Sequence, residues 1–261
     1  MKFIKKILKT KGITKEGKLK KLDKYPPLTI GYTDILGKPF KFHDRASFIV
    51  TYKELFVEEI YKFLPKSETG IIIDCGANIG LSVLYFSLNY PKLKIIAFEP
   101  QYDLFLILEE NVRQFDLKNV ELHNNAVWNK NEQLKFYTDG GMGGRVNCAY
   151  LSQEPTVVEA VPLKDYLDGE IEFLKIDIEG AEDTVLRSCV GKLSKINHIF
   201  FEYHNTKNQP QNLHQLLELM KNEGFEYYIK ESAIRYKPFI DTLVICETFN
   251  MALNVFCYKN P

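Results

Sequence analysis

The sequence has few cysteines and no closely spaced pair of them. Five cysteines lie among 261 residues, at positions 75, 148, 189, 246 and 257. Their number is odd and no C-x-x-C pair occurs, which argues against a disulfide framework and against a zinc site. This cysteine usage is typical of a reducing compartment, so we expect a cytoplasmic protein.

Long apolar segments are also missing. The start of the chain has no apolar core of signal-peptide length, and no stretch approaches the roughly 20 apolar residues of a membrane span. Net charge is zero, but the first 24 residues hold ten lysines against Glu16 and Asp23. They carry a net charge of +8, so the remainder carries −8. An acidic body gives no nucleic-acid footprint, and we expect no nucleic-acid partner.

The lysine-rich start, residues 1–24, has two interpretations. Phe3, Ile4, Ile7 and Leu8 share one stripe of a predicted short helix that is surrounded by lysines. Such a helix could make weak contact with an anionic membrane, at the inner membrane face. Alternatively, it docks on the acidic body with its lysines in solvent, and we favour this second interpretation.

Three apolar runs that end in an acid dominate the rest of the chain. They are residues 71–75, 94–99 and 171–178, with Asp74, Glu99 and Asp177 near their ends. Buried parallel strands have this pattern when they deliver polar groups at their carboxyl ends and lead into helices. The pattern predicts an open α/β sheet with a nucleoside-sized ligand across the strand ends.

Hydrophobic periodicity predicts the other elements. We expect strands at 120–127, 134–137, 157–163 and 196–203, two strands within 225–259, and helices at 53–64, 79–89, 101–115, 181–190 and 211–223. We divide the chain into a basic N-terminal helix and irregular cap, residues 1–52, and a main domain, residues 53–261.

The loop after the first strand is not a dinucleotide fingerprint. The pattern G-x-G-x-x-G would need glycine at positions 78 and 81, where Asn78 and Leu81 stand. An NAD-dependent oxidoreductase is therefore only an alternative. Gly76 allows close backbone approach, and Asn78 tolerates a left-handed conformation. A helix that begins near residues 79–82 would offer free N–H groups to a ligand.

Two further positions favour a nucleoside. Glu99 ends the second strand, where a carboxylate can accept both hydroxyls of a ribose, and Pro100 fixes the chain behind it. Asn125 and Ala126 fall late in the next predicted strand, where a small residue and an amide could border an adenine ring.

Acidic groups gather after the strand at 171–178. Strand alternation would place Asp177 and Glu179 on one side together with Lys175. Burying two acids there is costly without a purpose, whereas Asp183 reads as a partner of the helix dipole. Glu202 and His204 share a face of the next strand, and His204 is a candidate general base.

These segments resemble the FkbM-type methyltransferases, a branch of the class I S-adenosylmethionine-dependent enzymes. The resemblance covers roughly residues 53–230 and rests on five motifs: 74–80 (DCGANIG), 98–100 (FEP), 125–127 (NAV), 174–182 (LKIDIEGAE) and 202–204 (EYH). It implies a Rossmann-like, mostly parallel seven-stranded sheet with one antiparallel strand and helices on both faces.

The resemblance also implies a function. S-adenosylmethionine would bind along the first three strands and methylate a hydroxyl of a small molecule or glycan, a sugar or a secondary metabolite. The residues expected to bind it are Asp74, Gly76, Ala77, Asn78, Gly80, Glu99, Pro100, Asn125 and Ala126. Asp177, Glu179 and His204 are the expected catalytic residues. These acids could instead hold a divalent metal, an alternative that stays open and is not predicted. A non-catalytic partner-binding module with a relic nucleotide site is the other alternative. The sequence leaves the oligomeric state unassigned.

Overall fold

The computed structural model describes residues 14–138, 144–146, 154–206, 209–234, 236–240 and 249–259. The predicted helix at the lysine-rich start lies outside these ranges. Of the described residues, Cys75, Cys189 and Cys257 are buried free thiols.

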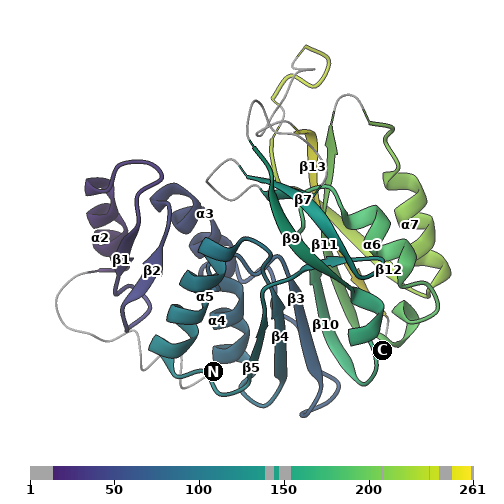
Figure 1. The fold of residues 1–261 in the computed structure, drawn as a ribbon, viewed down its shortest axis with the longest axis horizontal. Helices are drawn as coiled ribbons and strands as arrows, with labels where there is room; N and C mark the ends of the chain where they lie inside the picture. The colour runs from purple at the N-terminus through teal and green to yellow at the C-terminus, as the bar shows by residue number, and fades with distance from the viewer. Residues whose placement is uncertain are drawn as a thin grey trace.

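A seven-stranded sheet forms the centre of the molecule (Figure 1). Its strand order is β12 (Glu226–Glu231), β13 (Phe249–Tyr258), β11 (His198–Thr206), β10 (Ile171–Ile176), β3 (Ile71–Cys75), β4 (Lys94–Phe98) and β5 (Val120–His123). The central strand β3 pairs in parallel with β4 and β10, while β13 runs antiparallel to both β11 and β12. The predicted fold class, a mostly parallel seven-stranded sheet with one antiparallel strand, is confirmed.

Helices cover both faces of this sheet. The helices are α2 (Lys15–Lys20), α3 (Arg45–Phe56), α4 (Leu81–Asn89), α5 (Tyr102–Phe115), α6 (Glu182–Ser188) and α7 (Leu213–Asn222), with short 3₁₀ turns η1 (Lys21–Lys24), η2 (Leu163–Tyr166) and η3 (Leu193–Lys195). Neighbouring residues of β3 separate the two layers: Ile72 packs with α3, α4 and α5, and Ile73 packs with α6 and α7. Strands buried on both sides explain the near-continuous apolar runs of the sequence.

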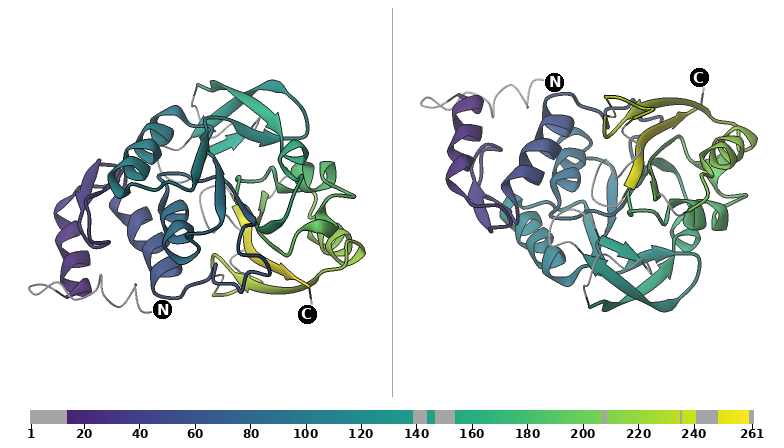
Figure 2. Two further views of the ribbon diagram at one scale, coloured as in Figure 1. Left: turned by 90° about the horizontal axis from the view of Figure 1, so that it is seen from below. Right: turned by 90° about the horizontal axis from the view of Figure 1, so that it is seen from above.

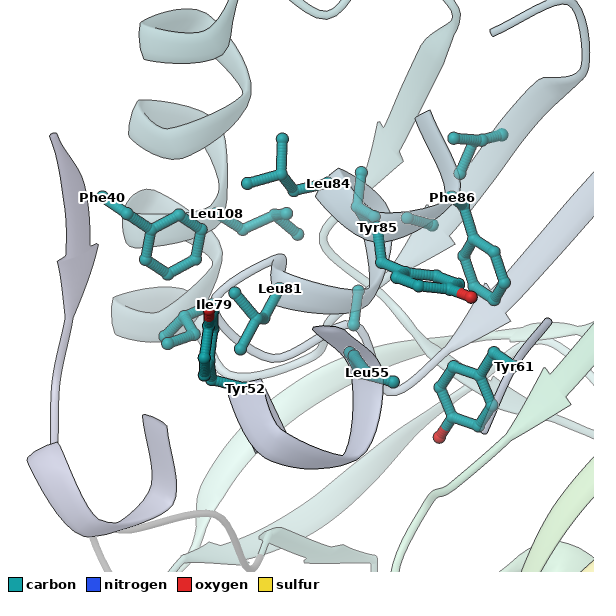
Figure 3. Close-up of a cluster of buried hydrophobic side chains, with 14 of the residues drawn as sticks. Phe40, Tyr52, Leu55, Tyr61, Ile79, Leu81, Leu84, Tyr85, Phe86 and Leu108 are labelled. Atoms are coloured by element: carbon teal, nitrogen blue, oxygen red, sulfur yellow. The ribbon is translucent and has the colours of Figure 1, made fainter. Parts of the chain in front are cut away.

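The N-terminal cap packs on the first of these layers. Its strands β1 (Gly31–Thr33) and β2 (Phe40–Phe42) form a small antiparallel pair at the end of the molecule opposite α7 (Figures 1 and 2). Tyr52 and Leu55 of α3 face Ile79 and Leu81 at the start of α4 (Figure 3). Helix α3 spans the predicted boundary between residues 52 and 53. The division of the chain into two parts therefore stays a prediction.

Two predicted elements were wrong in extent. Helix α3 begins at Arg45 and ends at Phe56, not at 53–64, because Asp44 caps it by accepting from the Ser47 N–H at 2.8 Å. The strand predicted at 120–127 is two strands. Strand β5 ends at His123, and Ala126 begins β6 (Ala126–Trp128), which belongs to a second sheet.

That second sheet has four strands in the order β6, β9, β7, β8. Strands β7 (Glu132–Thr138), β8 (Gly144–Val146) and β9 (Thr156–Pro162) fall where the regular alternation of the sequence lapses. Among the described residues, no helix combines the length and the hydropathy needed to cross a bilayer.

Candidate functional site

One cavity of about 300 Å³ opens at the carboxyl ends of the central parallel strands. Its lining includes the loop 76–79 after β3, Glu99 after β4, the segment 177–179 after β10, and parts of β11, β13 and α3. Parallel strands bring their carboxyl ends to one edge, which is why segments a hundred residues apart meet there. The cavity therefore has a side formed by the loops after β3, β4 and β5 and a side formed by β10, β11, β13 and α3.

The loop after β3 has the predicted backbone geometry. Gly76, Asn78 and Gly80 all have positive φ, at 83°, 50° and 86°. A side chain at Gly76 would place its Cβ 2.0 Å from the carbonyl oxygen of Asp177. The close backbone approach that requires glycine here is that of the chain after β10. Helix α4 begins at Leu81, with Gly80 as its cap.

Glu99 is buried and held by the backbone. Its Oε2 accepts from the Asn78 N–H and its Oε1 from the Gln101 N–H, each at 2.8 Å. Burial raises the pKa of Glu99 to about 7, against the opposing effect of these two hydrogen bonds. Each oxygen keeps a second lone pair, so the carboxylate can still accept two hydroxyls of a ribose. Glu99 and the loop beneath it therefore fit a nucleoside.

The segment after β5 differs from the predicted strand end. Ala126 is buried at the start of β6, and Asn125 next to it donates to the Glu159 carbonyl at 3.4 Å. Both line the cavity with Pro100. Asn124, which the sequence did not single out, donates to the carbonyl of Glu99 at 2.8 Å and so ties this bend to the Glu99 loop.

Asp74 and Ala77 support the loop from below. Asp74 is fully buried; it accepts from the Ser82 hydroxyl at 2.6 Å and lies 3.2 Å from Lys175 Nζ. Lys175 also donates to the Gly76 carbonyl at 2.8 Å. Burial works against the charge of Lys175, but the carboxylates of Asp74 and Asp177 outweigh it and raise its pKa. Asp74 thus anchors the loop, and Lys175 links it to the second side of the cavity.

The second side brings together Asp177, Glu179 and His204, as predicted, but by a different route. Strand β10 ends at Ile176, so strand alternation does not orient the two acids. Instead Glu179 adopts a left-handed conformation, with φ of 57°, and the chain turns back toward β11. Glu179 Oε2 then lies 3.6 Å from His204 Nε2, while Asp177 lies 3.4 Å from Lys175 Nζ.

His204 is surrounded by carboxylates. Its Nδ1 donates to Glu182 at 3.1 Å, and its Nε2 lies 3.6 Å from Glu202 as well as from Glu179. Burial alone lowers the pKa of His204, but the three glutamates raise it well above 6.5. Burial and the charge of Asp177 raise the pKa of Glu202 to about 7. Asp183, by contrast, pairs with Arg187 on the surface of α6.

Helix α3 forms the cover of this side. Ser47, Thr51 and Glu54 recur at helical spacing and line the cavity. Burial, then the charges of Asp177 and Glu58, raise the pKa of Glu54. Asn254 of β13 faces the cavity too, opposite Glu202 in the strand register. No pattern in the sequence pointed to Glu54 or Asn254, because neither belongs to a motif.

Comparison with known proteins agrees with this architecture. The model of the methyltransferase FkbM domain matches residues 74–227. Methyltransferase 1 of Beauveria bassiana is 29% identical over 162 residues, which cover 52% of this chain and 65% of that protein. Methyltransferase sdnD of Sordaria araneosa is 30% identical over 181 residues, covering 54% of this chain and 68% of that protein. The chain thus spans about two thirds of each of these relatives.

A solved structure was also found. M. jannaschii TYW2 in complex with AdoMet is 12% identical, with 90% of this chain and 89% of that chain covered and a TM-score of 0.45. Because the family model matches more than half of the chain, from the end of β3 to β12, the protein belongs to the FkbM domain family of S-adenosylmethionine-dependent methyltransferases.

Proposed function

We propose that the protein methylates a hydroxyl oxygen of a sugar or another small polar molecule. One observation carries this proposal: a single cavity contains both the Glu99 side and the cluster of Asp177, Glu179 and His204. A cofactor on the first side and an acceptor on the second would therefore meet within one cavity.

The first side would hold the cofactor. Glu99 would accept the ribose hydroxyls. The N–H groups of residues 76–80 are all donated within the protein, so the expected free N–H groups are not found in this loop, which would shape the site through its close backbone instead. Pro100, Asn125 and Ala126 would border the base. Asp74 would keep this loop in place, since its own oxygens are occupied by Ser82 and Lys175. When bound, S-adenosylmethionine supplies a methyl group on a sulfonium that is already an activated electrophile.

The second side would position the acceptor and handle its proton. A hydroxyl that attacks a methyl carbon has to lose its proton, and a well-placed base contributes about 10²–10⁴-fold to such a step. Asp177, Glu179 and His204 surround one position in the cavity. Glu182 holds the imidazole so that Nε2 points toward Glu179 and Glu202. The same groups would exclude water and orient the acceptor oxygen.

The lining of this side favours an acceptor rich in hydroxyls. Glu54, Glu202 and Asn254 all offer hydrogen-bond acceptors to the cavity, and hydroxyl groups are suitable donors to them. An anionic acceptor would meet like charges from Glu54, Asp177 and Glu179. We therefore propose a neutral polyol such as a sugar.

Two measurements test this function. Isothermal titration with S-adenosylmethionine and S-adenosylhomocysteine should give binding with both. Mass spectrometry should then detect a gain of one methyl group on a member of a panel of glycosides and hydroxylated metabolites. Binding of NAD with neither of the other two would favour the oxidoreductase. Cofactor binding with no product across the panel would favour the non-catalytic module.

The lysine-rich start has a separate proposal. We propose that residues 1–24 dock on the acidic body rather than on a membrane, and one contact in the described part of this segment supports it: Lys18 of α2 pairs with Asp34 at 3.1 Å. Co-sedimentation with anionic vesicles at low salt tests it, because vesicle binding that high salt abolishes would instead support contact with a membrane surface.

A further inference from the structure

Three metal-ligating side chains converge on the acceptor side of the cavity. The nearest ligand atoms of Asp177, Glu179 and His204 all lie within 4.8 Å of one another. Ligands of one cation at about 2.0–2.3 Å lie at most about 4.6 Å apart, so these three groups need to close in only slightly to hold a single ion. Asp177 and Glu179 follow the end of β10, and His204 lies in the neighbouring strand β11.

The orientation of His204 is that of a metal ligand. Its Nδ1 donates to Oε1 of Glu182, and that oxygen also accepts from the Gly180 N–H at 3.1 Å. Histidines that bind metals almost always donate their other ring N–H to a carboxylate or carbonyl, which fixes the ring and its tautomer. Glu182 is only 2% exposed, so this partner is itself well ordered.

The free edge of the ring faces oxygen atoms that are too far away for hydrogen bonds. Nε2 of His204 lies 3.6 Å from Glu179 Oε2 and 3.6 Å from Glu202 Oε1. Hydrogen bonds of this type are about 2.7–3.2 Å long. An imidazole nitrogen and two carboxylates thus surround a gap without closing on each other.

Asn254 supplies an independent observation. Its side chain is 5% exposed, and its Oδ1 has no hydrogen-bond partner among the described residues. It lies opposite Glu202 in the pairing of β11 with β13 and lines the same cavity. A buried acceptor without a partner indicates a missing donor or cation, and an amide oxygen can approach a cation directly or through its water.

Charge favours the same conclusion. Glu54, Asp177, Glu179 and Glu202 line this side of the cavity, and the described cations that pair with them are His204, when protonated, and Lys175, which is shared with Asp74. Buried charges need pairing to be tolerated. An ammonium group on the acceptor could supply one positive charge, but it would not engage the imidazole of His204, whose Nδ1–H is already donated to Glu182. A divalent cation uses both the carboxylates and the ring.

We propose that Asp177, Glu179 and His204 bind a divalent transition-metal ion beside Asn254. The mixed imidazole and carboxylate set suits such an ion better than Mg²⁺ or Ca²⁺, which prefer oxygen ligands alone. The chemical step rests on the proposed function: the ion would bind the acceptor hydroxyl and lower its pKa, and the released proton would pass to Glu202, a carboxylate of the same cavity that is not one of the three ligands. Binding of the ion itself does not depend on that function.

Mn²⁺ binding to the full-length protein, freed of metal with EDTA and dialysed, tests the proposal without any methyl transfer. Electron paramagnetic resonance should show saturable binding of one equivalent, and excess Mg²⁺ should displace it poorly. His204→Ala and Glu179→Gln should abolish binding or weaken it strongly. Glu182→Gln should weaken it by about 10- to 100-fold through the ring orientation. Asp168→Asn, a surface carboxylate that pairs with Lys192, is the control and should bind like the wild type.

Circular dichroism and cofactor titration identify any variant that has lost its fold. Absence of saturable Mn²⁺ binding to the wild type, or unchanged binding in both folded His204→Ala and Glu179→Gln, overturns the proposal. If Mn²⁺ binds but no acceptor is methylated, the metal site stands and the proposed function fails. If methylation proceeds at the same rate after EDTA treatment, the catalytic part of the proposal fails and the function stands.

Discussion

The two sides of the cavity are built in different ways. On the cofactor side, the polar groups are mostly satisfied by the backbone: Glu99 accepts from two N–H groups at 2.8 Å each, and Lys175 donates to the Gly76 carbonyl. On the acceptor side, side chains from α3, β10, β11 and β13 face one another across distances such as the 3.6 Å between His204 and Glu202.

The cofactor side is therefore preformed, whereas the acceptor side is completed by the ligand that binds there. The backbone contacts of the cofactor side join residues that belong to short motifs of the sequence. Opposing side chains from distant segments leave charges unbalanced, and unbalanced buried charge is costly unless a ligand, proton or cation compensates it. We therefore expect changes on the first side to alter cofactor affinity, and changes on the second to alter turnover.

The largest effect should come from the acceptor side. His204→Ala should lower the rate of methyl transfer by about 10²–10⁴-fold, because the imidazole that orients the acceptor and helps to remove its proton is lost. Cofactor affinity should stay close to that of the wild type. Single-turnover rates and titration calorimetry on the same preparations separate the two, with His214→Ala on the exposed side of α7 as the matched control. Full turnover in a folded His204→Ala protein would remove this residue from the site.

Glu99→Ala should produce the opposite pattern. Hydrogen bonds to a charged group contribute about 1.5–3 kcal/mol each, so losing one ribose contact alone weakens cofactor binding by about tenfold or more. The rate of the bound complex should change less. Calorimetry at several cofactor concentrations measures this, and affinity that stays the same in a folded variant would show that Glu99 does not touch the ligand.

Cofactor affinity should also depend on pH through Glu99. Its pKa is about 7 in the free protein, because it is buried, whereas ribose hydroxyls donate to the charged form and lower the pKa of the bound protein. Binding below pH 7 then requires loss of a proton, so affinity is full above pH 7 and falls as the pH decreases. Between pH 8 and pH 6 the expected loss is about tenfold. Glu99→Gln should remove this dependence, and a wild type with flat affinity over this range would contradict the assignment.

Gly76→Ala tests how tightly the loop after β3 packs against the chain after β10. The new Cβ would meet the Asp177 carbonyl oxygen at 2.0 Å, in addition to the strain of a residue with φ of 83°. Gly191 has the same φ but open space around it, so Gly191→Ala carries the strain alone, about 1–2 kcal/mol. Chemical denaturation should show a clearly larger loss for Gly76→Ala than for Gly191→Ala. Equal losses would mean that the loop shifts easily away from Asp177.

The smallest effect should follow from removing the cap of α3. Asp44 accepts from the N–H groups of Ser47 and Leu28, and Asp44→Ala should cost about 0.5–2 kcal/mol of stability. The cavity-lining face of α3 belongs to the acceptor side, whereas Tyr52 and Leu55 pack against Ile79 and Leu81 beside the cofactor loop. We therefore expect a higher KM for the acceptor and a smaller change in cofactor affinity. A change in cofactor affinity alone would show that α3 serves the other side.

The sequence predicts the cofactor side of the cavity better than the acceptor side. Local patterns were sufficient for the central sheet, for the turn at Gly76 and Asn78, and for the position of Glu99, since each depends on neighbours within a few residues. They failed where an irregular turn decides the outcome. Strand β5 stops at His123, and the chain after Ile176 leaves the strand, so that Glu179 reaches His204 through a left-handed residue.

The sequence by itself determined the family, the sheet and the loop of the cofactor side, because hydrophobic period and motif spacing are local properties of the chain. Only the tertiary structure decided what faces the acceptor. Glu54 of α3, Glu202 of β11 and Asn254 of β13 are separated by 148 and 52 positions in the sequence, and no local pattern connects them. Packing of α3 over the sheet, and the antiparallel return of β13 beside β11, bring them to one cavity.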